Sequence, residues 1–229
     1  MAPLSGLRAA LALLLLVAAG LLAGCSTMPA PGVWQDDTTR GSLPANVEWR
    51  SMGADGLDLT KKSEAYRGKP YDDPVGFCTV GYGHLIKKAR CDGSEPAEFL
   101  PRVSEPVATD LLREDLQLAE YPLLLAISPQ IVLTQTQFDA LCDFVFNVGA
   151  RNFRQSQLLV AVNAGEFHRV PDQFRRWVYA SKRKLPGLVT RREREIELFL
   201  RGVTLVRGPV AADEDLSPID IGTGQPPAR

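Results

Sequence analysis

The sequence has little of what metal and redox sites are built from. Its 229 residues include only two histidines, His84 and His168, and four cysteines. Neither histidine has a second histidine or a cysteine at the spacing of zinc ligands. The 26 Lys and Arg nearly balance the 27 Asp and Glu, so no overall positive field attracts nucleic acid. We therefore expect no metal, no cofactor and no nucleic-acid partner.

The chain also lacks an apolar run long enough to cross a bilayer. Its longest run, residues 9–22, is shorter than the roughly 18 to 20 residues that a spanning helix needs. The run follows a short start that carries Arg8 and leads into small residues before Cys25. Such an order is typical of an export signal. We expect residues 1–25 to be this signal and the protein to act in the periplasm or cell envelope.

The end of this signal, Leu-Ala-Gly-Cys25, resembles the lipobox of bacterial lipoproteins. In that class the cysteine is acylated and becomes the new N-terminus, so the resemblance implies lipidation of Cys25 and a membrane tether. Two alternatives stay open. The segment is also compatible with an ordinary signal peptide that contains a chance cysteine, and with a weak signal-anchor from which the protein is later released.

The composition divides the rest of the chain into three parts. Residues 26–54 are rich in Pro, Gly and Thr and predict a flexible tether. Residues 205–229 combine Pro, Gly and acidic residues with little to bury, which predicts a disordered tail. Residues 55–204 have the size of one domain, and we expect it to be monomeric.

Periodicity predicts an α+β fold for this domain. Good strand residues between 71 and 86, interrupted by glycines, predict a small antiparallel β-hairpin or meander. Helical periods then dominate. Thr134 is expected to cap a buried helix that ends at Gly149. Further helices are expected at residues 56–66, from Ser104 to Pro122, and at 156–163, 170–179 and 190–200.

Cys78 and Cys91 flank the expected hairpin and the loop after it. Because export permits disulfides, we expect a Cys78–Cys91 bond, which would stabilise the domain by roughly 2 to 3 kcal/mol. Cys142 lies on the apolar side of its expected helix and is interpreted as a core residue.

Three residues on one turn-rich segment suggest a chemistry. Glu64, Asp73 and Thr79 offer an acid, a second carboxylate and a hydroxyl, which is the equipment for breaking a glycosidic bond with water. Taken singly, each has a plainer interpretation, as an exposed helix Glu, a turn Asp or a strand Thr. Asp72 also competes with Asp73 for the role of second carboxylate.

An ordered set of short motifs spans nearly the whole domain: Glu64–Tyr66, Asp73, Gly76, Thr79–His84, Gln137–Leu141, Phe144–Gly149, Asn152, Phe153, Ser156, Asn163–Gly165, Phe174, Trp177 and Pro186–Arg192. Together these motifs resemble phage-type lysozymes of glycoside hydrolase family 24. The resemblance implies a two-lobed fold with a cleft between a small β lobe and a helical lobe. A loop at 87–102 that is longer than usual, and the pair Cys78 and Cys91, depart from the family pattern.

The resemblance also implies a role for each member of the trio. Glu64 would protonate the leaving oxygen between N-acetylmuramic acid and N-acetylglucosamine in peptidoglycan. Asp73 and Thr79 would hold a water on the other side of the sugar. Inversion at the anomeric carbon would follow, with the carboxyl groups roughly 6.5 to 9.5 Å apart.

Matching positions suggest further roles. His84 and Asp115 are expected to form a structural pair. Leu85, Phe146, Asn147 and Ser156 are expected to line the sugar cleft, although Phe146 is equally explained as core. Arg191 and Arg192 are expected to contact structure or anionic peptide stems. They belong to a basic stretch, residues 151–201, with 12 Lys and Arg against 5 Asp and Glu, which favours peptidoglycan as the partner.

Two other functions compete with a hydrolase. A lytic transglycosylase would form an anhydro sugar without water and would have no use for Asp73 and Thr79. A non-catalytic peptidoglycan-binding lipoprotein would be expected to lose one member of the trio, and all three are present. The sequence is compatible with both host lysis and cell-wall remodelling.

Overall fold

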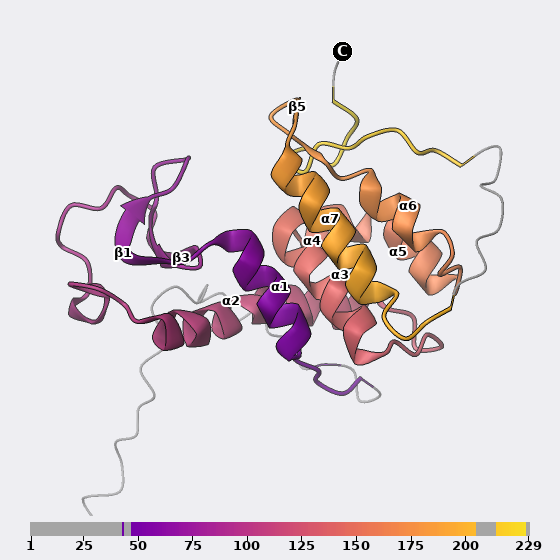
Figure 1. Ribbon diagram of the computed structural model, residues 1–229, viewed down its shortest axis with the longest axis horizontal. Coiled ribbons are helices and arrows are strands. Elements are labelled where there is room, and N and C mark those ends of the chain that lie inside the picture. The colour runs from indigo at the N-terminus through magenta and orange to yellow at the C-terminus, as the bar shows by residue number, and fades with distance from the viewer. Residues whose placement is uncertain (1–42, 44–46, 205–213, 228–229) are drawn as a thin grey trace, which may run out of the picture. The chain divides into compact units, whose positions relative to one another are not determined.

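The computed structural model describes residue 43, residues 47–204 and residues 214–227 (Figure 1). The expected export signal, the lipidation site Cys25 and most of the expected tether lie outside these residues. Within the part of the chain that is described, no helix is both long enough and apolar enough to span a membrane.

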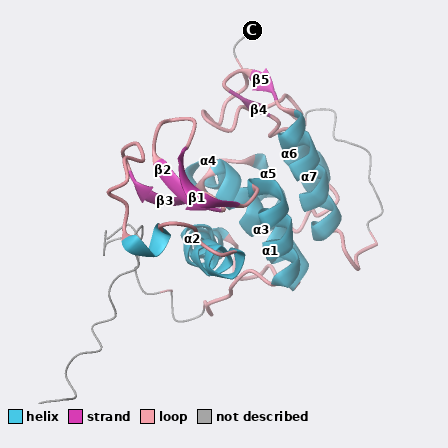
Figure 2. Cartoon of the chain, turned by 60° about the vertical axis from the view of Figure 1, so that its left-hand side comes forward, coloured by secondary structure: helices cyan, strands magenta, loops and turns pink. Residues whose placement is uncertain are grey.

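The order of elements confirms the α+β class. A short helix leads into a three-stranded sheet, and helices dominate thereafter (Figure 2). The helices are α1 (Ala54–Glu64), α2 (Glu105–Ala126), α3 (Gln135–Val148), α4 (Ala150–Arg154), α5 (Gln157–Asn163), α6 (Val170–Arg175) and α7 (Pro186–Phe199), with a 3-10 turn at Ala97–Phe99. The strands are β1 (Arg67–Asp72), β2 (Cys78–Gly81) and β3 (His84–Lys87), and a second pair comprises β4 (Tyr179–Ala180) and β5 (Arg183–Lys184).

The first sheet is antiparallel in the order β1-β2-β3, as the sequence predicts. Its register pairs Tyr71 with Thr79 and Asp72 with Cys78, and opposite the step from Cys78 to Thr79 the partner strand β3 has one extra residue, Ile86. Helix α2 packs on this sheet. Gly81, at φ +69°, permits the close approach, since a Cβ there would lie 3.0 Å from the Cβ of Ala108.

Helix α3 is the centre of the helical part and packs against α1, α2 and α7. Thr134 forms a capping box with Gln137 at its start, and Gly149, at φ +85°, ends it, so both predicted boundaries are confirmed. The predicted apolar positions are buried: Phe138, Leu141, Cys142 and Val145. This helix therefore organises the core around which the others pack.

Helix α2 differs from its prediction in length. Pro122 was expected to end it, yet the helix continues to Ala126. Pro122 offers no amide hydrogen to the carbonyl of Leu118, a residue that is half exposed. Leu123, which is fully buried, holds the last turn on the core, so tertiary packing outweighs the local effect of proline.

The C-terminal segment differs from the expected disordered tail. Between residues 214 and 227 the chain lies against β4 and α6, where Ile219 enters the core. Tyr179 forms a parallel bridge with Asp220, and Arg176 Nη2 lies 2.8 Å from Asp215 Oδ2. The pairing residues are about 40 positions apart in the chain. Composition alone therefore gave no sign of this docking.

The start of the domain also lies earlier than residue 55. Met52 is buried, and its amide donates to Glu120 Oε1 at 2.7 Å. The amide of Gly53 donates to Asp139 Oδ1 at 2.8 Å. The last residues of the expected tether thus belong to the folded domain.

Candidate active site

Glu64 is the last residue of α1, the helix that leads into the sheet (Figure 1). Its side chain is 27% exposed, which leaves the carboxyl group in reach of a ligand. Arg191 Nη1, from α7, donates to Glu64 Oε1 at 2.6 Å. A charge-assisted bond of this length fixes the orientation of the carboxyl group.

Arg191 is itself held by a buried carboxylate. Its Nε and Nη2 donate to the two oxygens of Asp143 at 2.9 and 2.8 Å, and the Thr60 hydroxyl donates to Asp143 Oδ1 at 2.7 Å. Burial alone would raise the pKa of Asp143, but the Arg191 guanidinium outweighs it and lowers that pKa. Burial likewise opposes the charge on Arg191, yet Asp143 raises its pKa. The pair is therefore ionised, and Glu64 faces a fixed positive charge.

This contact gives Arg191 a place beside the proposed acid that the sequence did not assign to it. The sequence predicts only that Arg191 contacts other parts of the fold or the anionic peptide stems of the substrate. Glu64 and Arg191 are 127 positions apart, and no periodic pattern in the sequence links residues at such a distance.

Asp73 follows β1 directly and shapes the turn into β2. Its Oδ1 accepts from the amides of Val75 and Phe77 at 2.9 and 2.8 Å, while its own amide donates to Phe77 O at 2.9 Å. The neighbouring Asp72 is engaged elsewhere, by Arg90 Nε and the amide of Cys91. The two adjacent carboxylates thus have different partners. Asp73 binds amides of the β1–β2 turn, and Asp72 binds the loop that contains Arg90 and Cys91.

Thr79 lies in β2, opposite Tyr71 of β1. It is buried, and its hydroxyl donates to Tyr71 O at 3.2 Å. Because a hydroxyl has one proton, its remaining capacity at this site is to accept. Glu64, Asp73 and Thr79 therefore stand on three consecutive elements: the end of α1, the β1–β2 turn and β2.

His84 and Asp115 form the predicted structural pair. His84 Nδ1 lies 3.1 and 3.0 Å from the two Asp115 oxygens, and His84 is buried. His84 begins β3 and Asp115 lies in α2. The contact ties the sheet to the longest helix.

A cavity of about 280 Å³ lies where the sheet meets the helices. Leu85 of β3, Asp115 and Leu118 of α2, and Phe146 of α3 line it, together with Gly83, Ala119, Val145, Gly149 and Ala150. Two of the four residues predicted to contact sugar, Leu85 and Phe146, are thus on its wall. Apolar walls with few polar groups are typical of ligand cavities.

Asn147 and Ser156 do not line this cavity. Asn147 Oδ1 accepts from Arg192 Nη2 at 2.8 Å. The Ser156 hydroxyl caps α5, accepting from the Leu159 amide at 3.1 Å and donating to Phe153 O at 2.7 Å. The structure gives both side chains partners within the helical part.

The predicted Cys78–Cys91 disulfide is present. Among the described residues, Cys78, Cys91 and Glu95 form the one group of potential metal ligands close enough together to hold an ion. Since the two sulfurs are bonded to each other, they are not available as thiolates.

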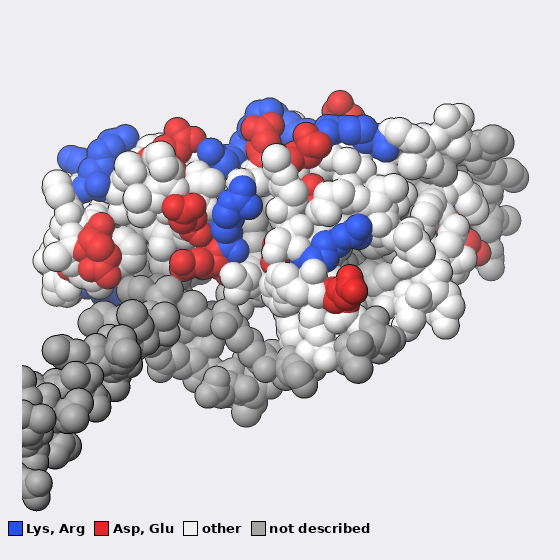
Figure 3. Space-filling view, turned by 90° about the horizontal axis from the view of Figure 1, so that it is seen from below, with Lys and Arg blue, Asp and Glu red and all other residues white. Residues whose placement is uncertain are grey.

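Part of the basic excess after residue 151 is neutralised in the fold. Arg169 Nε lies 3.0 Å from Glu214, Arg176 pairs with Asp215, and Arg175 Nε lies 2.8 Å from Glu193. Two of these partners come from the C-terminal segment. On the face shown in Figure 3, acidic and basic side chains are interspersed.

The chain is similar to known proteins in sequence and in fold. Residues 61–195 match the family model described as phage lysozyme. The chain is 39% identical over 154 residues to the SAR-endolysin of Bacteriophage PS119, covering 66% of this chain and 80% of that protein. It is 34% identical over 149 residues to the endolysin of Salmonella phage P22, covering 65% and 97%. The solved muramidase domain of SpmX from Asticaccaulis excentricus is similar, with a TM-score of 0.57 at 31% identity, covering 66% of this chain and 98% of that one.

Proposed function

The chain belongs to the phage lysozyme family, and from this premise we propose how its residues divide the work of cleaving peptidoglycan. The protein is a lysozyme, a glycoside hydrolase that breaks down the bacterial cell wall. The assignment of roles rests on the contact between Glu64 and Arg191. Glu64 ends α1, the helix that precedes Asp73 and Thr79 in the chain, and Arg191 lies in α7.

Glu64 is the general acid of this proposal. It donates a proton to the oxygen that leaves when the β-1,4 bond between N-acetylmuramic acid and N-acetylglucosamine breaks. Arg191 holds Oε1 and so fixes the direction in which the carboxyl group presents its proton. The partial exposure of the side chain leaves room for the sugar.

Asp73 and Thr79 hold the attacking water. Thr79 uses its proton on Tyr71 O, so it accepts from the water, and the carboxylate of Asp73 accepts the other water proton. The lone pair of the water then points at the anomeric carbon, opposite the leaving oxygen. Attack from that face inverts the configuration. Asp73 also stabilises the positive charge that develops on the sugar ring.

The products distinguish this reaction from that of a lytic transglycosylase. Hydrolysis of purified sacculi releases reducing ends, whereas transglycosylation leaves anhydro ends. Mass spectrometry of the released fragments separates the two. NMR of the first-formed anomer, recorded before mutarotation, tests inversion.

A non-catalytic peptidoglycan-binding lipoprotein is the other alternative. It predicts that Glu64→Gln changes nothing, since binding does not need the acid. Loss of fragment release in this variant, with sedimentation on sacculi retained, supports the hydrolase.

The protein is also proposed to be exported and to work from the periplasmic side of the wall. Some of the relatives carry the name SAR-endolysin. The sequence Leu-Ala-Gly-Cys25 favours a lipid tether at Cys25, with a signal-anchor as the competing possibility. Palmitate labelling, compared between wild type and Cys25→Ser and with globomycin added, separates them. An uncleaved and unlabelled chain that still lyses cells would support the anchor.

A further inference from the structure

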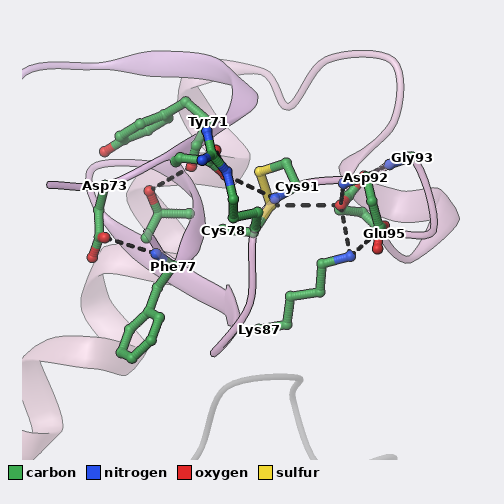
Figure 4. The surroundings of a disulfide bond; sticks show 12 residues. Tyr71, Asp73, Phe77, Cys78, Lys87, Cys91, Asp92, Gly93 and Glu95 are labelled. Carbon is green, nitrogen blue, oxygen red and sulfur yellow. Dashed lines mark hydrogen bonds and ion pairs between the residues drawn. A yellow bond between two sulfur atoms is a disulfide. The ribbon is translucent and has the colours of Figure 1, made fainter. Parts of the chain in front are cut away.

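We propose that Asp72 and the Cys78–Cys91 disulfide brace the ends of β1 and β2 and thereby position Asp73 and Thr79 for hydrolysis. The proposal rests on the roles given above to Asp73 and Thr79. The brace comprises Asp72, Cys78 and the loop segment 89–91. Figure 4 shows the disulfide between Cys78 and Cys91, with Asp73 nearby.

Both carboxylate oxygens of Asp72 accept a hydrogen bond from the loop. The amide of Cys91 donates to its Oδ1 at 2.8 Å, and Arg90 Nε donates to its Oδ2 at 2.9 Å. Both oxygens therefore face the loop and not the β1–β2 turn. This carboxylate attaches the last residue of β1 to the segment that carries Cys91.

The same loop segment is attached to the first residue of β2. Cys78 is bonded to Cys91, and its amide donates to Ala89 O at 2.8 Å. Cys78 is fully buried and is the register partner of Asp72 across the two strands. Asp72, Cys78 and Cys91 thus form a closed triangle of one strand pairing, one covalent bond and one hydrogen bond.

The two strand residues of the brace are each followed in the chain by a residue that is proposed to hold the attacking water. Asp73 follows Asp72, and Thr79 follows Cys78. Because successive side chains of a strand point to opposite faces, the brace holds one face while Thr79 serves the other. Asp72 pairs with Cys78 and Tyr71 with Thr79, so β1 and β2 are in regular register at this junction. The register shift opposite this step belongs to the pairing with β3, where Ile86 is the extra residue.

The contacts of the brace differ in strength. Arg90 is 81% exposed, so its ion pair with Asp72 is weak. The hydrogen bond from the Cys91 amide to Asp72 and the Cys78–Cys91 disulfide are less exposed to water. These two contacts fix the ends of β1 and β2 relative to the loop. Next to the brace, Lys87, the last residue of β3, pairs with Asp92 at 2.5 Å and with Glu95 at 2.9 Å. These pairs stabilise the loop but do not contact Asp72.

The loop therefore offers a matched control. Asp92→Ala removes an ion pair between the loop and β3, and Asp72→Ala removes the link between the loop and β1. If the brace only stabilised the fold, both changes would lower the melting temperature and leave turnover alone. A displacement of about 1 Å in a catalytic group can cost about 100-fold in rate, so a positioning role appears in kcat.

The test measures kcat, KM and Tm on solubilised glycan strands at a temperature well below unfolding. We expect Asp72→Ala, and the double variant Cys78→Ser/Cys91→Ser, to lose about 10-fold to 100-fold in kcat with KM changed less than about twofold. Arg90→Ala should lose about twofold at most, and Arg90→Lys should match wild type. Asp92→Ala should keep the wild-type kcat, even if its Tm falls.

Asp72→Asn keeps the shape of the side chain and serves if Asp72→Ala does not fold, as judged by near-ultraviolet circular dichroism. Wild-type kcat in a folded Asp72 variant and in the double cysteine variant would overturn the brace. An equal loss in Asp92→Ala would do the same. The variant Asp73→Asn distinguishes failure of the brace from failure of the proposed function. If Asp73→Asn is fully active while Asp72→Ala is inactive, Asp72 is itself the second carboxylate. In that case both the brace and the role given to Asp73 are wrong.

Discussion

Arg191 donates to Glu64 at 2.6 Å and thereby joins the end of α1 to α7, the last helix of the domain. Behind it, Arg191 makes two bonds to the buried Asp143 on α3. The position of the proposed acid is thus determined by three helices that meet at one guanidinium. Stability and catalysis are therefore coupled at this guanidinium.

Removing Arg191 should destabilise the protein strongly. Arg191→Ala leaves Asp143 ionised and buried without its partner, which typically costs about 3 to 5 kcal/mol in unfolding free energy. Arg191→Lys keeps a charge but loses the fork that reaches both Asp143 and Glu64, so we expect a smaller loss of stability and a clear loss of kcat. Urea unfolding and fragment-release assays measure the two effects.

Arg175 provides the control for this change. It is a partly exposed arginine paired with Glu193, and Arg175→Ala should cost no more than about 1 kcal/mol. If Arg191→Ala unfolded at the same urea concentration as Arg175→Ala, the buried ion pair would not have the role described here.

Stability should also depend on pH through Asp143. Burial alone would raise its pKa, but pairing with Arg191 holds it below the ordinary value. An acid whose folded pKa is depressed contributes stability above its unfolded pKa, about 3.9, and loses it as pH falls through the folded pKa. The wild-type unfolding free energy should therefore fall steeply below about pH 4.

Asp143→Asn should make this acid limb shallower. Asp58→Asn, which removes a carboxylate that is 63% exposed, is the control for the loss of one negative charge. Urea titrations between pH 2 and pH 7 give the slopes, and identical slopes for wild type and Asp143→Asn would contradict the assignment.

The cavity wall predicts which residues govern substrate affinity. Leu85 and Phe146 line it, whereas Asn147 and Ser156 do not. Leu85→Ser should raise KM about tenfold through lost apolar contact with kcat changed less than about threefold. Val132→Ser, at an exposed position off the cavity, is the control. An unchanged KM in Leu85→Ser would place the glycan elsewhere.

The docked C-terminal segment should stabilise the domain. Ile219 is buried, and Ile219→Ala should cost about 2 to 4 kcal/mol, as for other core truncations. Leu216→Ala, at a side chain 40% exposed, should cost less than about 1 kcal/mol. Thermal unfolding of both variants, and of a chain ending at residue 205, measures the effect. A truncated chain with the wild-type Tm would show that the docking contributes nothing.

The sequence predicted those features that depend on near neighbours. Thr134 and Gly149 mark the two ends of α3 in the sequence, and the apolar period between them is strong. Cys78 and Cys91 flank a short loop, so their pairing needed no knowledge of the fold.

Features that depend on distant partners were missed or misplaced. Pro122 does not end α2, because Leu123 packs on the core. The composition of the segment from Glu214 to Asp220 predicts disorder. Its docking was missed because the arginines that bind it lie some 40 residues earlier in the chain. Arg191 was separated from Glu64 by most of the domain, and only the folded chain brings the two together.

The most direct test of the central claim is digestion of purified sacculi by wild type and by Glu64→Gln, with reducing ends quantified in the released fragments. The account predicts that wild type releases reducing ends, and that Glu64→Gln folds with an unchanged circular dichroism spectrum but retains less than about 1% of the rate. Wild-type release by the folded Glu64→Gln variant, or anhydro ends in the wild-type products, would contradict it.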